Sequence, residues 1–340
     1  MKKILILTAA FVAMLASCQK NEIGANQLGD EQVTLSVNLP GVTTKATGDA
    51  AQVDKLFYEL YDAQSNQLAK GSTGIDAFGK ATINFTLIRN AEYTVLYWAQ
   101  CSQSPYDAEP SDLTNIDMKY SLNEDAPAVG NDETRDAFYG VQTFTADGTD
   151  PAAVTLTRPF AQLNFLSSDF ATDLGYGESG VGNLVLEKTL VDIEVAGTTF
   201  NVATGASNQT EGGSHIYFAT YNDSTGPAYL DVDGEEGIDQ LYGKAIISMN
   251  YILLANKNTE TAKVNASFYY SIENEDGETF TYDTPQSFTL TGLTMMENHR
   301  TNVSGAFFVG SGTFEVGVDG EFTTPDIEKD PFEITGAVSE

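Results

Sequence analysis

The chain has 340 residues, a length typical of two domains, with 48 Asp and Glu against 17 Lys and Arg and a formal net charge of −31. Such a charge repels phosphates and excludes the basic footprint of a nucleic-acid-binding protein. It does not indicate disorder, because 41% of the residues are hydrophobic and 19 Phe and 16 Tyr supply large side chains to a core. We therefore expect a folded, acidic chain with no nucleic-acid partner.

The chain begins with the features of a bacterial export signal, which we place at residues 1–17. Lys2 and Lys3 precede an apolar run over residues 4–16, which is too short to span a bilayer. The next residues, Leu15-Ala16-Ser17-Cys18, resemble a lipobox. In a lipobox the cysteine receives lipid and becomes the first residue of the mature protein. The alternative is an ordinary signal peptide followed by an unmodified cysteine.

Lipidation of Cys18 predicts a tethered protein, because two or more acyl chains, such as palmitate, hold a protein stably at a membrane. Residues 18–32 are polar and lack periodicity, so we expect them to form a spacer between the lipid and the fold. An acylated Cys18 leaves Cys101, the only other cysteine, without an intrachain disulfide partner. We expect Cys101 to be a buried free thiol.

After the spacer the hydrophobic period becomes two. The apolar residues Val33, Leu35, Val37 and Leu39 alternate with polar residues, which is typical of a half-buried strand, and Pro40 ends the pattern. Comparable short apolar patterns recur downstream, separated by turns that contain Gly, Asn and Asp. They lie at residues 57–61, 81–87, 93–97, 154–156, 161–165, 268–272, 288–290 and 314–318.

The recurring strands predict an all-β protein, because no ten-residue stretch combines a sustained period of 3.6 with helix caps. Many short strands in a chain of this length favour two antiparallel β-sandwich domains over one barrel. Residues 167–182 hold four glycines and no long apolar run, so we place the domain boundary there, to within about fifteen residues. The division is an N-terminal domain at 33–172, a C-terminal domain at 173–323 and an acidic tail at 324–340, which is disordered or a detachable arm.

The chain offers little that indicates catalysis. His215 and His299 lie outside the G-x-S-x-G and H-E-x-x-H motifs, so we expect both to be structural or solvated. Residues 175–180 match G-x-G-x-x-G, but a strand follows them where a dinucleotide site needs a helix N-terminus. The acidic residues at 231–236, with Asp239, offer oxygen ligands for calcium, but their spacing is not that of an EF-hand loop, which favours a solvated hairpin tip. We expect no enzyme, no cofactor and no metal.

An aromatic platform for glycans is a separate hypothesis. Trp98 is the only tryptophan, and its strand carries apolar residues on both faces, which favours a place in the core. A tyrosine-rich segment at residues 217–221 keeps glycan binding open. The corresponding alternative function is a monomeric outer-membrane lipoprotein that binds glycans in a nutrient-uptake system and retains its first strand.

Several segments together resemble the fimbrillin family, the lipoprotein precursors of type V pili in Bacteroidales. Residues 156–163 and 298–303 are similar to the family patterns L-x-R-P-f-A-q-i/l and N-x-R-T-N-i/v, and the lipobox and the first strand with the loop after it also fit. The four segments read LASC, VTLSVNLPGVTTKA, LTRPFAQL and NHRTNV. The resemblance implies two transthyretin-like β-sandwich domains in a non-enzymatic subunit or adhesin of a fimbria, at the outer membrane and cell surface.

The resemblance also implies a mechanism of assembly by strand exchange. A trypsin-like surface protease would cut after Lys45, before Ala46, the first strand would leave, and a strand of a neighbouring fimbrial subunit would replace it. The exchanged strand would be the one that carries Val33 and the alternating apolar residues after it. Many fimbrillins have Arg where this chain has Lys45, so the processing enzyme would have to accept Lys. The implied partners are other fimbrial subunits, the protease, the membrane through lipid on Cys18, and a host glycan or protein.

Three points stay open at the level of sequence. The first strand could be an ordinary edge strand that never leaves. The donor strand could lie at residues 313–322 or in the weakly alternating tail at 332–338. Arg158 and Arg300, both in motif segments, are expected to tie carboxylates and backbone carbonyls together and not to act in catalysis.

Overall fold

The computed structural model describes residues 28–40, 52–107, 110–167, 183–221, 240–241, 244–255, 259–273, 279–281, 285–308 and 314–321. These residues form strands joined by turns, and the only helical element among them is a single 3-10 turn, η1 (Glu133–Arg135). The all-β class predicted from the sequence is confirmed. In this part of the chain no helix has the length and apolarity needed to cross a membrane.

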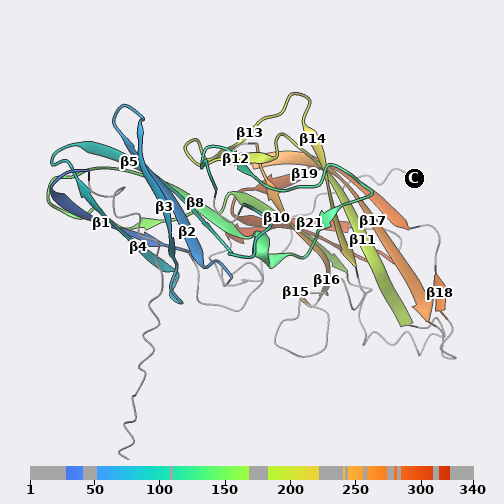
Figure 1. Ribbon diagram of the computed structural model, residues 1–340. Helices are drawn as coiled ribbons and strands as arrows, with labels where there is room; N and C mark the ends of the chain where they lie inside the picture. The colour runs from blue at the N-terminus through green and yellow to red at the C-terminus, as the bar shows by residue number, and fades with distance from the viewer. Residues whose placement is uncertain are drawn as a thin grey trace, which may run out of the picture.

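Two sheets enclose the first core, at the left of Figure 1. One has the order β4-β1-β9 and the other the order β3-β2-β5-β8. Side chains from both sheets form one hydrophobic cluster, which places the core between them, as in a sandwich. The strands are β1 (Glu31–Asn38), β2 (Lys55–Asp62), β3 (Gln67–Gly74), β4 (Lys80–Leu87), β5 (Glu92–Gln100), β8 (Ala137–Thr145) and β9 (Val154–Thr155).

Two larger sheets enclose the second core, at the right of Figure 1. One has the order β15-β16-β10-β20-β21, and the other has the order β18-β17-β11-β14-β7 with β19 also paired to β17. The strands are β7 (Ala128–Val129), β10 (Phe160–Ser167), β11 (Asn183–Val195), β14 (Ser214–Tyr221), β15 (Gln240–Leu241), β16 (Lys244–Leu253), β17 (Thr259–Glu273), β18 (Thr279–Thr281), β19 (Gln286–Met296), β20 (His299–Gly305) and β21 (Phe314–Glu321).

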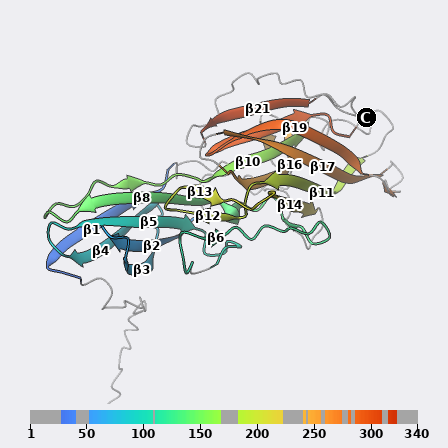
Figure 2. The ribbon, with the colours of Figure 1, turned by 90° about the horizontal axis from the view of Figure 1, so that it is seen from above.

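A third hydrophobic cluster joins the two halves. It contains Phe57 and Trp98 from the first half and Phe200, Met249 and Tyr251 from the second. The small sheet β13-β12-β6 lies against it, made of β6 (Ile116–Asp117), β12 (Thr199–Asn201) and β13 (Ala206–Asn208). In the view of Figure 2 the two halves form one elongated body, with the small sheet between them.

The chain between β5 and β8 crosses from the first half to the second. Its strand β6 pairs with β12, and β7 pairs in parallel with β14. The Tyr120 hydroxyl donates to the carbonyl of Tyr251 (3.0 Å) and accepts from the N–H of Leu253 (2.9 Å). These contacts join the halves through backbone as well as through side chains, so the junction is built like the interior of a domain.

The expected division at residue 172 stays a prediction, but one strand near it is informative. β10, which that division assigns to the first domain, pairs antiparallel with β16 and parallel with β20. All eight of its side chains are buried, because one face of β10 packs in the second core and the other in the junction.

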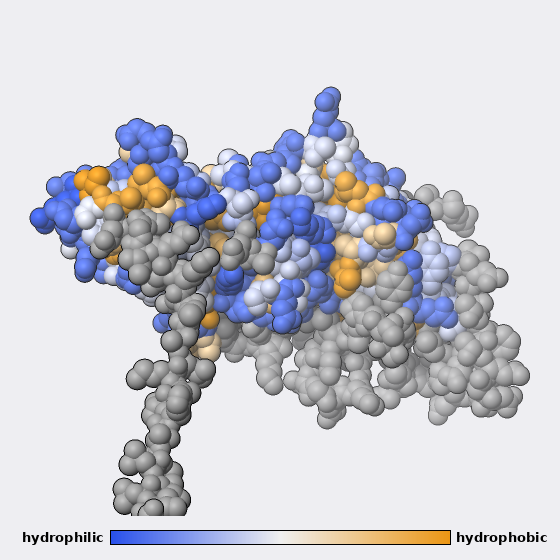
Figure 3. Space-filling model, in the orientation of Figure 1, coloured by the Kyte–Doolittle hydropathy of each residue, from blue (hydrophilic) through white to orange (hydrophobic). Residues whose placement is uncertain are grey.

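The two expectations about buried side chains are confirmed. Trp98 is fully buried in the junction, where its indole N–H donates to the side-chain oxygen of Gln100 (2.8 Å). Cys101 is a buried free thiol, and burial raises its pKa, which disfavours the reactive thiolate. The face shown in Figure 3 is mostly hydrophilic, with separate apolar patches. Among the described residues the exposed large hydrophobic side chains are Phe78, Ile88, Leu122, Val129 and Val141.

Candidate strand-exchange site

The apolar side chains of β1 and of Leu39, the residue that follows it, form one continuous face in the first core. The side chains of Val33, Leu35, Val37 and Leu39 are 2%, 0%, 2% and 8% exposed, and the polar residues between them point outward. Burying one such side chain contributes about 1.5–3 kcal/mol, so the four together contribute about 6–12 kcal/mol at most. That is comparable to the whole stability of a typical domain, about 5–15 kcal/mol.

One edge of β1 is paired along its whole length with β4. The antiparallel register runs over eight positions, from Glu31 opposite Leu87 to Asn38 opposite Lys80. β4 shows the same alternation of buried and exposed residues as β1, so both strands direct their apolar side chains into the same core. β4 therefore forms a regular wall for whichever strand occupies the position of β1.

The other edge of β1 is paired only near its end. Val37 and Asn38 pair in parallel with β9, and the N–H of Leu156 donates to the carbonyl of Asn38 (2.9 Å). Further toward the start of β1, the N–H of Thr34 donates to Oδ1 of Asp150 (2.7 Å). β1 is thus the middle strand of its sheet, with a long antiparallel wall on one side and a short parallel wall on the other.

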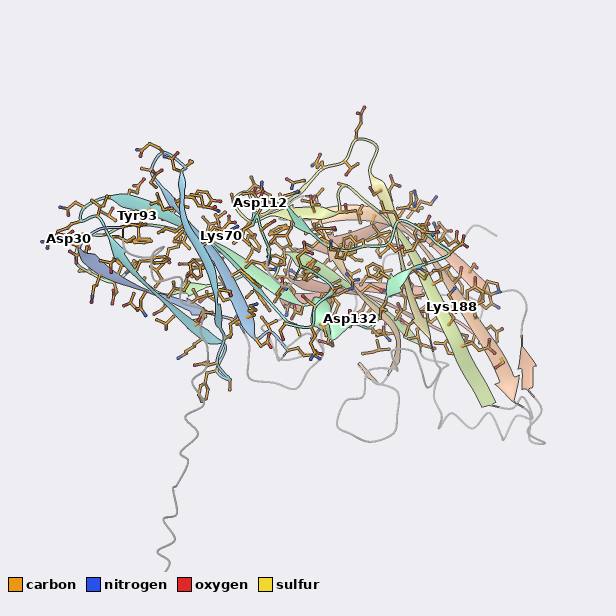
Figure 4. All side chains as sticks on the ribbon, in the orientation of Figure 1. Asp30, Lys70, Tyr93, Asp112, Asp132 and Lys188 are labelled. Carbon is orange, nitrogen blue, oxygen red and sulfur yellow. The ribbon has the colours of Figure 1, made fainter. Side chains whose placement is uncertain are left out.

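The entry to β1 passes close against the end of β4. Asp30, labelled in Figure 4 at the outer end of the molecule, donates its N–H to the carbonyl of Leu87 (3.1 Å), and the N–H of Gly29 donates to the carbonyl of Thr86 (3.1 Å). A Cβ placed on Gly29 would overlap the carbonyl group of Leu87. Glycine is therefore needed at this position for the backbones to approach each other.

The close approach at Gly29 predicts a specific destabilisation. We expect Gly29→Ala to lower the free energy of unfolding by about 1–3 kcal/mol, because the overlapping atoms belong to backbone and cannot rotate away. Gly74→Ala is the matched control, since a Cβ there meets no atom within 4 Å and the residue ends an exposed strand. Urea unfolding of both variants measures the difference, and equal stabilities would show that the entry of β1 tolerates a side chain.

The exit of β1 is held by the turn before β4. The N–H of Leu39 donates to the carbonyl of Gly79 (2.7 Å), and Oδ1 of Asp76 accepts from the N–H of Phe78 and of Lys80 (both 2.9 Å). The ion pair between Glu31 and Arg89 (3.3 Å), near the other end of β1, contributes little, because the Arg89 side chain is 64% exposed.

The structure places only part of the predicted site. Val33, Leu35 and Val37 of the exchanged strand lie in β1 and Leu39 directly follows it, whereas Cys18, Lys45 and Ala46 lie outside the described residues. Of the two donor candidates, residues 314–321 form β21, which pairs with β20, and its Val316 is buried in the second core. The tail at 332–338 lies outside the described residues. Which segment donates a strand stays open.

The other candidates from the sequence are accounted for by structural contacts or lie outside the described ranges. Nδ1 of His215 lies 2.8 Å from Oδ1 of Asp192, and Nδ1 of His299 lies 2.7 Å from the carbonyl of Glu297. The segments at 175–180 and 231–239 are outside those ranges. No group of three metal-binding side chains occurs among the residues that the structure describes.

Arg158 has the structural contacts expected of it. Its guanidinium donates to both carboxylate oxygens of Asp136, at 2.6 and 2.7 Å, and to the side-chain oxygen of Asn298 (3.0 Å). Burial lowers the pKa of the guanidinium, but the charge and hydrogen bonds of Asp136 outweigh it, so the pKa is raised. Arg158 thereby connects the start of β8 to the turn between β19 and β20. Arg300 is also buried.

Sequence reasoning did not identify Asp150 as part of the site. Asp150 and Thr34 are separated by 116 positions, and an aspartate before a proline in a loop carries no signal that it contacts a strand so far away. The parallel pairing of β1 with β9 was not predicted for the same reason. It depends on where the chain after β8 lies and not on a local pattern.

The fold and the site define an all-β architecture with a buried first strand in the middle of its sheet. The chain belongs to a family of unknown function, DUF6562, whose model matches residues 25–335. No curated protein matches the sequence.

Several solved structures of bacterial proteins are similar to the chain. They include a "putative cell adhesion protein" from Bacteroides eggerthii (15% identity, TM-score 0.47, covering 88% of this chain and 98% of that one). A fimbrial assembly protein from Parabacteroides distasonis (12%, 0.42, 88% and 100%) and the tip fimbrial protein Mfa3 from Porphyromonas gingivalis with C-terminal truncation (11%, 0.35, 85% and 98%) are also similar. The resemblance inferred from the motifs is confirmed, but sequence identities and TM-scores this low assign no function to this chain.

Proposed function

We propose that this chain is the surface lipoprotein precursor of a fimbrial subunit or a fimbria-associated adhesin, and not an enzyme. In this proposal Cys18 carries lipid, a surface protease cuts near Lys45, β1 leaves, and a strand of a neighbouring subunit takes its place. The role agrees with the descriptions of two similar proteins, a fimbrial assembly protein and a tip fimbrial protein. The observation that carries the proposal is the position of β1 between two strands, of which β4 pairs with it along its whole length and β9 only near its end.

The energy of β1 explains why its loss would drive assembly. Without β1, the sheet β4-β1-β9 would have a gap in its middle, with the inward face of the core and the backbone edge of β4 both open. An unpaired sheet edge beside exposed apolar surface binds a strand by β-augmentation. Because the four apolar side chains contribute about 6–12 kcal/mol, a comparable replacement strand would restore the stability that the processed subunit lacks.

The alternative of a monomeric glycan-binding lipoprotein loses its first aromatic candidate. Trp98 is fully buried in the junction and cannot stack on a sugar. That alternative also requires β1 and the lipid to be retained for the life of the protein. The two functions therefore differ in the state of the mature N-terminus.

The proposed processing predicts a mature chain that begins at Ala46. We expect N-terminal sequencing and intact mass of the surface protein to show the loss of residues 18–45, and we expect the protein to run as a heat-sensitive ladder. Lys45 is the only basic residue between Pro40 and Asp54, so Lys45→Ala should leave a monomer that begins at acylated Cys18. Lys45→Arg is the control that keeps the positive charge and should restore both cleavage and the ladder. A wild-type protein that keeps Cys18 and runs as a monomer would contradict the proposal.

A further inference from the structure

On the edge that faces β9, the backbone of β1 donates one hydrogen bond and accepts another. The carboxylate of Asp150 accepts from the N–H of Thr34, so it requires a donor at that position. The N–H of Leu156 donates to the carbonyl of Asn38, so it requires an acceptor four residues further along. Both contacts involve backbone groups of β1 and are therefore independent of its side chains.

The edge that faces β4 carries a third contact. The N–H of Leu39 donates to the carbonyl of Gly79 (2.7 Å), which requires a donor at the exit of the strand. In a β-strand the N–H and C=O of one residue point to the same edge, and those of the next residue point to the opposite edge. Thr34 and Asn38 therefore present their backbone groups to the side of β9, and Leu39 presents its own to β4.

A strand that ran in the opposite direction could not satisfy these contacts. Reversal exchanges the places of N–H and C=O along the strand, so the carboxylate of Asp150 would face a carbonyl oxygen and the N–H of Leu156 would face another N–H. Sliding the reversed strand to realign its backbone groups would move its side chains away from the places of Leu35 and its apolar neighbours, because side-chain position and register are coupled.

We infer that the β1 position accepts a strand in one direction only, that of β1 itself, and that Asp150 is a specificity-determining residue for that direction. This inference rests on the proposed function, in which the occupant is a strand of another subunit. The occupant is an extended segment with aliphatic side chains at four alternate positions, antiparallel to β4 and parallel to β9. The site therefore selects the N-to-C direction of the occupant strand as well as its pattern of apolar side chains.

Competition between peptides during refolding tests the inference on the full chain. A site for a specific protease is placed between residues 42 and 48, the folded protein is cut, and both fragments are unfolded in urea and refolded with an excess of labelled peptide. Two peptides share the sequence of residues 30–40, one with Asp30→Cys and the other with Pro40→Cys, and the protein carries Ile88→Cys at an exposed position beside the start of β1. Both peptides are acetylated and amidated, so that terminal charges do not differ. The first measurement is the fraction of folded protein that holds labelled peptide in place of its own β1. The second is the fraction of bound peptide that forms a disulfide with Cys at position 88, because only a peptide in the direction of β1 brings residue 30 there and only a reversed one brings residue 40 there.

We expect the peptide with Cys at position 30 to cross-link at least about tenfold more than the peptide with Cys at position 40, because a strand in the reversed direction forfeits two or more hydrogen bonds. Equal cross-linking by the two bound peptides would overturn the inference and leave the proposed strand exchange intact. If neither peptide entered a protein that had lost β1, the position would not accept a strand at all, and the proposed function would fail together with the inference.

The role of Asp150 is tested by the ratio of cross-linking of the two peptides. In Asp150→Ala we expect the share of cross-linking through Cys at position 40, which reports the reversed direction, to rise about three- to tenfold over wild type. Asp112→Ala is the matched control, since Oδ1 of Asp112 also accepts a backbone N–H at 2.7 Å, from Thr114, in a loop away from β1. A merely stabilising aspartate would lower stability without changing the ratio, so an unchanged ratio in Asp150→Ala would remove Asp150 from the inference.

Discussion

Replacing Arg158 by methionine should lower the free energy of unfolding by about 3–5 kcal/mol. The variant leaves the carboxylate of Asp136 buried at 2% side-chain exposure without the guanidinium that now binds both of its oxygens. Removing one partner of a buried ion pair is costly for this reason, because the remaining charge loses its compensation without regaining water. Urea unfolding followed by the fluorescence of Trp98, the only tryptophan and part of the junction, measures the loss.

Two controls separate the charge from the packing. The double variant Arg158→Met, Asp136→Leu removes both charges and should recover most of the stability, because an apolar pair of similar volume often replaces a buried ion pair at little cost. Arg89→Met removes an exposed partner of Glu31 and should change stability by at most about 1 kcal/mol. A loss below about 1 kcal/mol in Arg158→Met would show that the contact with Asp136 does not stabilise the junction.

Replacing Leu35 by alanine should lower the free energy of unfolding of the full chain by about 2–5 kcal/mol. Leu35 is fully buried at the middle of β1, opposite Ile83 in β4, and its loss leaves a cavity that the two flanking sheets cannot readily fill. The neighbouring Ser36→Ala is the matched control on the same strand, and it should change stability by no more than about 0.5 kcal/mol, because its side chain points away from the core.

The same pair of variants connects stability to strand exchange. In a chain cut after β1, the strand is held only by non-covalent contacts, so the loss at Leu35 becomes a loss of affinity. Since 1.4 kcal/mol corresponds to a factor of ten, Leu35→Ala should weaken retention of β1 by a factor of about thirty or more. Gel filtration of the cut protein measures the retained strand. Equal retention in the alanine variants at 35 and 36 would show that the apolar face of β1 does not hold it in place.

The contacts around Arg158 also bear on what happens when β1 leaves. The chain after β9 reaches Thr157, whose N–H and C=O both pair with Tyr139, and then reaches Arg158. Asn298 donates its N–H to the carbonyl of Phe160 (2.8 Å) from the second half. The segment that follows β9 is therefore held to the junction by backbone contacts that do not involve β1. We expect these contacts to keep β9 in place when β1 leaves.

The all-β class and the burial of one face of β1 follow from local patterns in the amino-acid sequence. Alternation of Val33, Leu35, Val37 and Leu39 with polar residues is a local property with a period of two, and a strand with one face in a core must show it. The placement of Trp98 in the interior was also predictable, because apolar residues on both sides of a strand indicate burial of both faces.

The contacts that surround these elements depend on how distant segments of the chain come together. β10 shows alternation in Ala161, Leu163 and Phe165, yet the polar residues between them are also buried, because the junction covers the second face. Arg158 pairs with Asp136, but no local pattern in the sequence indicates which of the 48 acidic residues is its partner. Asp150 and the parallel wall of β1 depend on a loop brought back across more than a hundred positions. Local periodicity determines which face of a strand is buried. The residues that this face and the two edges of the strand contact are determined by how the whole chain folds.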